Sequence, residues 1–218
     1  DIYSFDVTDS GSYLNEDYLG SNINTKYHEG LASFDNEGNM YISRESFYEN
    51  EYVKDPESNN ITSLIGIYKI TKGEKNVVAL NINSVEYSVK NPSVSSDGKT
   101  LYFSSDMPGG FGNFDIYKGD IDEQGNINNV ENLGQKVNTE GQEMFPFIGD
   151  KNNLYFSSDS QLGLGGLDVF FTKEVDGKWA SARNVGIPVN SNADDFAFNM
   201  NEATGEGFVS SNRTGGKG

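Results

Sequence analysis

The sequence predicts an all-β fold built from repeated four-stranded units, and two kinds of observation lead to that prediction. The segment Asn91–Lys118 contains an Asp-Gly turn, the apolar run Leu-Tyr-Phe-Ser-Ser centred on Tyr102, a glycine-rich loop and a second short strand. The run returns at Tyr155 and, as Gly-Phe-Val-Ser-Ser, at Phe208, each time after 53 residues. No long window has apolar residues at helical spacing. Repeats of roughly 40 to 50 residues with several short strands indicate the blades of a β-propeller.

Two other landmarks keep the same phase. The second short strand, Asp115-Ile116-Tyr117, has counterparts in Asp168-Val169-Phe170 and, less closely, Gly66-Ile67-Tyr68. An apolar residue followed by Asn and then Thr or Ser, called the connector motif below, recurs after 59, 55 and 52 residues. Three landmarks in phase make chance similarity an inadequate explanation. The connector motifs are Ile23-Asn24-Thr25, Ile82-Asn83-Ser84, Val137-Asn138-Thr139 and Val189-Asn190-Ser191.

The repeats predict a single β-propeller domain, residues 1–218, with about four of five or more four-stranded antiparallel blades present. Asp1-Ile2-Tyr3 has the form of a blade's third strand, and the sequence after Ser211 stops where the next such strand would begin. We therefore expect an incomplete blade at each end. The predicted divisions are 1–22 for the outer strands of the first incomplete blade, 23–80, 81–133 and 134–185 for whole blades, and 186–218 for the inner strands of the last.

The first whole blade is longer than the others. Tyr41, in the run Met-Tyr-Ile-Ser, lies 61 residues before Tyr102, and the polar stretch from Glu45 to Ser63 accounts for the added length. We expect this stretch to be an insertion between the second and third strands. The predicted strands of this blade are Leu31–Phe34, Asn39–Ser43, Ile65–Ile70 and Val77–Leu80.

Runs such as Leu101-Tyr102-Phe103 are apolar on both faces, which is typical of a strand whose sheet is covered on both sides. Blades stacked around an axis cover each other in this way, so the repeated tyrosines are predicted to be packing residues. Two closures of the ring are compatible with the repeats. Either further sequence completes it, or the first strands pair with the last half-blade. We favour a ring held by something outside this sequence, because unpaired strand edges invite aggregation.

Composition excludes several classes of function. The formal net charge is −17, whereas nucleic acid or anionic lipid would need a basic surface. There is no cysteine, which excludes a disulfide scaffold and thiol chemistry. The chain has neither an apolar run of about 18 residues nor a signal peptide, so we expect no direct membrane insertion by this segment.

Nothing in the sequence predicts a catalytic residue, a cofactor or a metal site. His28 is the single histidine, it falls in a polar connection, and no Gly-x-Ser-x-Gly elbow accompanies it, so we expect a surface position for it. Paired carboxylates of the glycosidase kind remain an alternative among 33 acidic residues, but none stands out by apolar surroundings.

Two motifs imitate ligand sites. Asp120 and Asp122, with Glu131 at the twelfth place, imitate a calcium loop, but they occupy a hairpin position and a following strand would carry Glu131 away. We therefore predict a plain turn and leave calcium binding open. The glycine loops lack the helix that a phosphate cradle needs and the nine-residue period of calcium-binding glycine repeats. Asp115 and Asp168 are predicted to accept backbone N–H groups from these loops.

The residues also carry a family resemblance. The stretch from Pro92 to Ser105 resembles the PD40, or WD40-like, repeat shared with the TolB propeller. Further segments resemble the propeller of bacterial OmpA-family outer-membrane-associated proteins, a family that includes the lipoprotein PorE of the type IX secretion and gliding machinery. These segments are 24–30, 105–110, 138–141, 163–168 and 211–213.

The resemblance implies a periplasmic, outer-membrane-associated module flanked by other domains, with peptidoglycan bound only through a domain outside this chain. We accordingly expect a non-enzymatic scaffold that holds protein partners of the cell envelope through the insertion and the glycine loops. The alternative is a carbohydrate- or peptide-binding or hydrolysing propeller whose site lies on the central axis.

Overall fold

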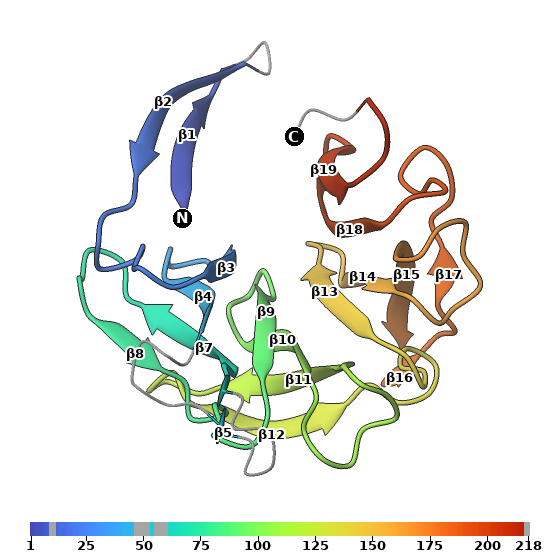
Figure 1. The fold of residues 1–218 in the computed structure, drawn as a ribbon, viewed down its shortest axis with the longest axis horizontal. Coiled ribbons are helices and arrows are strands. Elements are labelled where there is room, and N and C mark those ends of the chain that lie inside the picture. Colours follow the sequence, from blue (N-terminus) through green and yellow to red (C-terminus); the bar gives the residue numbers. More distant parts are fainter. Residues whose placement is uncertain (9–11, 46–52, 55–60, 216–218) are drawn as a thin grey trace.

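The computed structural model describes residues 1–8, 12–45, 53–54 and 61–215, and this part of the chain is all-β (Figure 1). Successive sheets are arranged around a common centre, with β3, β9, β13 and β18 nearest to it. Each sheet is antiparallel and is formed by strands consecutive in the chain, β5 and β6 aside. The predicted fold class, an incomplete β-propeller, is confirmed.

Three sheets are whole blades. The first blade contains β3 (Glu29–Phe34), β4 (Met40–Glu45), β7 (Ile65–Ile70) and β8 (Val77–Ala79). The second contains β9 (Val89–Val94), β10 (Thr100–Ser105), β11 (Asp115–Ile121) and β12 (Ile127–Asn132). The third contains β13 (Glu143–Ile148), β14 (Asn153–Ser158) and β15 (Asp168–Val175), with β16 (Lys178–Trp179) and β17 (Arg183–Asn184) both pairing with β15.

The other sheets have two strands each. The N-terminal hairpin is β1 (Tyr3–Val7) with β2 (Tyr13–Tyr18), and the C-terminal hairpin is β18 (Asp195–Asn201) with β19 (Glu206–Ser211). Inside the predicted insertion, β5 (Val53–Lys54) pairs with β6 (Ile61–Thr62); its residues 46–52 and 55–60 lie outside the described residues. The exact domain divisions stay a prediction.

In the first two blades, aspartates fix the tight turn that joins the first and second strands. Asp35 Oδ1 accepts the backbone N–H groups of Glu37 at 3.0 Å and Asn39 at 2.8 Å. Asp97 does the same for Lys99 at 3.1 Å, and Gly98 beside it has a φ of 72°. An Asx side chain that satisfies turn amides and a glycine in the left-handed region are what such turns require.

The blades are covered on both faces, as the apolar runs predict. Leu101 and Phe103 point to one side of β10 and pack in a cluster with Tyr41 of the first blade. Tyr102 points to the other side and packs with Leu154 of the third blade. We call the contact between the first and second blades the first seam, and that between the second and third blades the second seam.

Burial of the repeated aromatic residue falls toward the C-terminus. Tyr41 and Tyr102 are buried, Tyr155 is half-buried, and Phe208 is 60% exposed. The packing role predicted for the tyrosines therefore holds most fully at the two seams between whole blades. Phe208 differs because it lies on β19, which pairs only with β18 among the described strands.

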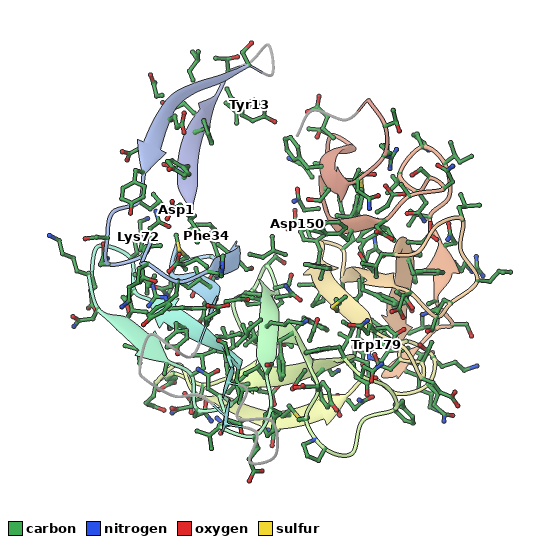
Figure 2. The ribbon with its side chains drawn as sticks, viewed as in Figure 1. Asp1, Tyr13, Phe34, Lys72, Asp150 and Trp179 are labelled. Carbon is green, nitrogen blue, oxygen red and sulfur yellow. The ribbon has the colours of Figure 1, made fainter. Side chains whose placement is uncertain are left out.

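The two terminal hairpins touch without sharing a sheet. No described residue of β1 or β2 pairs with β18 or β19, so the closure by direct strand pairing is not present in this part of the chain. Tyr13 lies on the side of its hairpin that faces β19 (Figure 2), and its ring centroid is 6.0 Å from that of Phe208. Tyr102 and Trp179 meet across the second seam at a similar distance, 6.1 Å. Tyr13 is 51% exposed and Phe208 is 60% exposed, so this ring contact buries less than the contacts at the two seams do.

Candidate interaction face

The end of the blades where β4, β10 and β14 finish carries the long connections, and we call it the loop face. Its two glycine loops are held by buried aspartates. Asp115 accepts the N–H groups of Phe111 at 2.5 Å and Gly112 at 3.2 Å. Asp168 accepts those of Leu164 at 2.7 Å and Gly165 at 3.0 Å. The role predicted for both aspartates is confirmed.

The close approach of backbone to carboxylate explains one glycine in each loop. A Cβ atom at Gly110 would lie 2.2 Å from Asp115 Oδ2, and one at Gly163 would lie 1.9 Å from Asp168 Oδ2. Any side chain at these positions would collide with the acceptor that shapes the loop. The two aspartates and the two glycines therefore constrain the shape of these loops.

The loop face presents large apolar side chains to solvent. Leu162 is 95% exposed, and Phe111 and Leu164 on the same two loops are also exposed. Val85 and Ile187, in the connections that lead into β9 and β18, are exposed as well. Apolar and aromatic residues gathered on rigid loops are typical of surfaces that bind another macromolecule.

The connector motifs have a structural role that sequence reasoning missed. The amide of Asn138 accepts the N–H of Ile116 at 2.8 Å and donates to its carbonyl at 3.0 Å, as a neighbouring strand would. Asn24, Asn83 and Asn190 make the same pair of bonds with Ile2, Ile67 and Val169. Each connector thereby fastens one blade to the third strand of the blade before it. The recurrence of Asn at the same place in each connector motif could have predicted this role.

A buried acid four residues after the motif shapes the connector. Glu143 accepts the N–H and the hydroxyl of Thr139, both at 2.7 Å. Asp195 does the same for Ser191, at 2.5 and 2.8 Å, and Glu29 for Thr25, at 2.9 and 2.6 Å. Ser88 occupies this place in the second blade. The hydrogen bonds to these acids therefore hold the backbone conformation of the connectors.

In the first blade and in the C-terminal hairpin, an arginine contacts both the connector and its buried acid. Arg44 Nη2 donates to the carbonyl of Ile23 at 2.7 Å, and Arg44 Nε lies 3.7 Å from the Glu29 carboxylate. Arg213 likewise donates to the carbonyl of Pro188 at 3.0 Å and pairs with Asp195. Burial acts to raise the pKa of Asp195, but hydrogen bonds from Ser211, Arg213 and Ser191 bring this pKa below its usual value.

Within the described ranges, Glu143 forms no ion pair with an arginine or lysine. The side chain that bonds the matching carbonyl in the third blade is neutral, because Gln161 Nε2 donates to Val137 at 3.0 Å. Burial raises the pKa of Glu143 above its usual value, although hydrogen bonds from Ser158 and Thr139 lower it in part and nearby Asp115 raises it further. The oxygens of the Glu143 carboxyl accept hydrogen bonds from Thr139 and Ser158.

The sequence-level candidates for chemistry are dispersed. His28 is exposed in the connection before β3, as predicted. Asp122 accepts the N–H groups of Gln124 at 3.0 Å and Asn126 at 2.8 Å, and Glu131 pairs with Lys118 at 3.1 Å on the neighbouring strand. The segment forms a turn, as predicted, and whether Asp120 and Asp122 bind calcium stays open. Within the described ranges, no group of three or more His, Cys, Asp or Glu side chains is placed to hold a metal ion.

The axis of the ring contains a cavity of about 470 Å³ between β3, β9, β13 and β18. Phe34 and Asp150 lie near the middle of the ring (Figure 2). Asp150 is the one carboxylate of this lining, while Phe34, Phe147 and Phe198 supply aromatic rings. The cavity therefore offers apolar contact without the pair of carboxylates that glycosidic hydrolysis requires.

Comparison with known proteins supports the fold alone. No protein-family model matches the chain, and no curated protein matches it. Among solved structures, a gluconolactonase from Xanthomonas campestris aligns with 94% of this chain at 13% identity and a TM-score of 0.54. A TolB-like protein from Agrobacterium tumefaciens aligns with 88% of this chain and 72% of its own length, at 16% identity and a TM-score of 0.51. The chain is a β-propeller. It spans 60% of the length of the gluconolactonase.

No helix in the described part of the chain is long and apolar enough to span a membrane.

Proposed function

We propose that this chain is a non-catalytic propeller module that holds protein partners in the bacterial cell envelope through its loop face. One observation carries the proposal: exposed Phe111, Leu162 and Leu164 stand on loops whose shape is fixed by buried Asp115 and Asp168. Preformed apolar contacts lose little conformational entropy on binding, which favours recognition of a partner protein.

The resemblance to OmpA-family propellers gives the proposal its setting. In that setting the chain belongs to an OmpA-like, peptidoglycan-associated outer-membrane protein linked to type IX secretion or gliding, on the periplasmic side. Peptidoglycan is then bound by a domain outside this chain. The likeness to a TolB-like structure agrees with an envelope location.

A capture experiment tests the loop face directly. The purified chain is cross-linked in the envelope fraction of a bacterium that carries this sequence, and bound proteins are identified by mass spectrometry. We expect the triple variant Phe111→Ser, Leu162→Ser, Leu164→Ser to lose a partner that the unmodified chain retains. Val175→Ser removes an exposed apolar side chain from the opposite end of a blade and is the matched control. Equal capture by all three proteins would contradict the proposal.

The alternative function, binding or hydrolysis of a carbohydrate or peptide on the axis, is favoured by the aromatic lining around Phe34 and Phe147. A panel of glycosidase and peptidase substrates separates the two proposals. Turnover that is lost in Asp150→Asn would replace the scaffold proposal with an enzymatic one.

A further inference from the structure

The opposite end of the blades, where the tight turns lie, contains a second candidate site. A cleft of about 770 Å³ opens at the turn end of the first seam, where the β3–β4, β9–β10 and β11–β12 turns meet. We call it the seam cleft. Six carboxylates line it: Asp35, Glu37, Asp97, Asp120, Asp122 and Glu123.

The rim of the seam cleft is preorganised. Asp35, Asp97 and Asp122 each accept the backbone N–H groups of their own turn, so the turns are fixed before any ligand arrives. Asn36 Nδ2 reaches the carbonyl of Asp97 at 3.5 Å and links the first blade to the second. Hydrogen bonds, led by those from Ser95 to Asp97 and from Asn126 to Asp122, hold the pKa values of these two carboxyls below the usual range. The rim is therefore negatively charged at neutral pH.

The positive charges of the seam cleft do not balance its carboxylates. Lys69 and Lys99 also line it, but neither forms an ion pair within 4 Å with a described residue. Two lysines against six carboxylates leave an excess of negative charge. Such an excess, in a concave site, concentrates cations.

The hydroxyl of Tyr41, which lines the floor of the seam cleft, is an independent indication of a ligand. Tyr41 is 0% exposed, and its hydroxyl has no hydrogen-bond partner among the described residues, although Tyr41 lines the seam cleft. Leaving a buried hydroxyl without a hydrogen-bond partner is unfavourable, so such groups are uncommon in folded proteins unless a ligand or water satisfies them. Lys69 Nζ lies 5.5 Å from the centroid of the Tyr41 ring, which shows that this ring already accommodates a cation on its face.

The second seam has a smaller cleft of about 400 Å³ at the same end, lined by Tyr102, Lys118 and Trp179 among others, but the lysine of this cleft is ion-paired. Lys118 is paired with Tyr102 as Lys69 is with Tyr41 on neighbouring strands. Lys118 forms ion pairs with Glu131 at 3.1 Å and Glu174 at 3.5 Å and lies 5.8 Å from the Trp179 ring. There the chain supplies both the cation and its counter-charges.

We propose that the seam cleft binds an organic cation, the ammonium or guanidinium group of a basic peptide segment or polyamine. The hydroxyl of Tyr41 accepts a hydrogen bond from that group at the floor, and Glu37 and Glu123 meet it at the rim. A metal ion fits less well, because the oxygens of the turn aspartates are occupied by N–H donors and the carboxylates are spread over three turns. This site is separate from the loop face, so either proposal can fail without the other.

Calorimetric titration of the whole chain at low ionic strength tests the proposal, with tri-arginine, tri-lysine and spermidine as probes. We expect Tyr41→Phe and the double variant Glu37→Gln, Glu123→Gln each to weaken binding of a probe by about five-fold or more. Tyr102→Phe removes the equivalent hydroxyl of the second seam. The double variant Glu16→Gln, Glu140→Gln removes two exposed charges elsewhere. Both controls should leave the dissociation constant unchanged.

The outcomes separate the possible sources and the possible errors. Tighter binding of the tripeptides than of spermidine identifies a protein segment as the ligand, and the reverse order identifies a free polyamine; both support the site. Unchanged affinity in Tyr41→Phe, or equal weakening in both charge variants, would reduce the effect to diffuse charge and overturn the proposal. Tyr41-dependent binding of calcium chloride alone would overturn it too. Thermal melting confirms that each variant is folded.

Discussion

The first and second seams arise from the same repeat and differ at their turn ends in the charges that surround the buried tyrosine. Each buries a tyrosine of the blade's second strand, and burial raises the pKa of both Tyr41 and Tyr102 to about 12, with smaller contributions from nearby carboxylates. Beside Tyr102 lie Trp179 and Lys118, which is ion-paired with Glu131 and Glu174. Beside Tyr41 lie the acidic seam cleft and Lys69, which has no ion pair within 4 Å among the described residues. The repeat thus determines where a tyrosine is buried, and the turn residues determine what its hydroxyl meets.

The largest expected effect is the loss of stability when the buried tyrosine that both seams share is removed. Tyr41→Ala and Tyr102→Ala should each lower the free energy of unfolding by about 3–5 kcal/mol, because each removes a buried ring from a packed core. Urea denaturation measures both. A cost below about 1 kcal/mol at either position would show that its seam is not a packed interface.

The connector asparagines should rank next. Asn138→Ala leaves the N–H of Ile116 without its partner at a buried site, at a cost of about 1–3 kcal/mol, whereas the carbonyl of Ile116 keeps the bond that it accepts from the N–H of Leu133. Asn83→Ala does the same to Ile67 at the first seam, but Asn83 is only half-buried, so water can replace part of the loss. Urea midpoints should therefore fall further for Asn138→Ala; the opposite order would contradict this account.

Phenylalanine substitutions isolate the hydroxyls. Tyr41→Phe should raise the free energy of unfolding by roughly 1 kcal/mol in the absence of ligand, because the hydroxyl it removes has no described partner. Tyr102→Phe is the control and should change it by less. Thermal melts of the two variants beside the unmodified chain decide the matter. A destabilised Tyr41→Phe would mean that the hydroxyl is already satisfied.

The repeat could be predicted from the sequence because apolar runs and turn residues recur at regular intervals. The apolar run Leu101-Tyr102-Phe103 predicted a strand covered on both faces. Asp115 and Asp168, placed directly after the glycine loops, predicted how those loops are held. No sequence pattern predicted the seam cleft. Its residues Asp35, Asp97 and Asp122 belong to three turns that are distant in sequence and come together only when two blades stack. Asp120 and Asp122 suggested a calcium loop because spacing alone does not show that β12 carries Glu131 to Lys118.

The loop ends of the seams differ in pH dependence. Glu143 is buried beside the second seam, whereas Ser88 occupies the corresponding place at the first. Since the folded-state pKa of Glu143 is raised, its favourable contribution is complete below the unfolded pKa near 4.5 and is lost as the pH rises through the folded pKa. We expect unfolding free energies measured from pH 4 to 7 to fall less with pH in Glu143→Gln than in the unmodified chain. Identical slopes would mean that Glu143 is not perturbed.

The central claim is that both seams belong to one packed ring, so that neither is stable without the other. Trp179 is the single tryptophan and reports on the second seam; Ile127→Trp combined with Trp179→Phe places the reporter in the first seam, within the cluster around Tyr41. Fluorescence-monitored urea unfolding of the two proteins should give single transitions, each coincident with the loss of β-sheet circular dichroism measured on the same sample. A transition at one reporter that precedes the loss of circular dichroism would show that the blades unfold separately, and would contradict the claim.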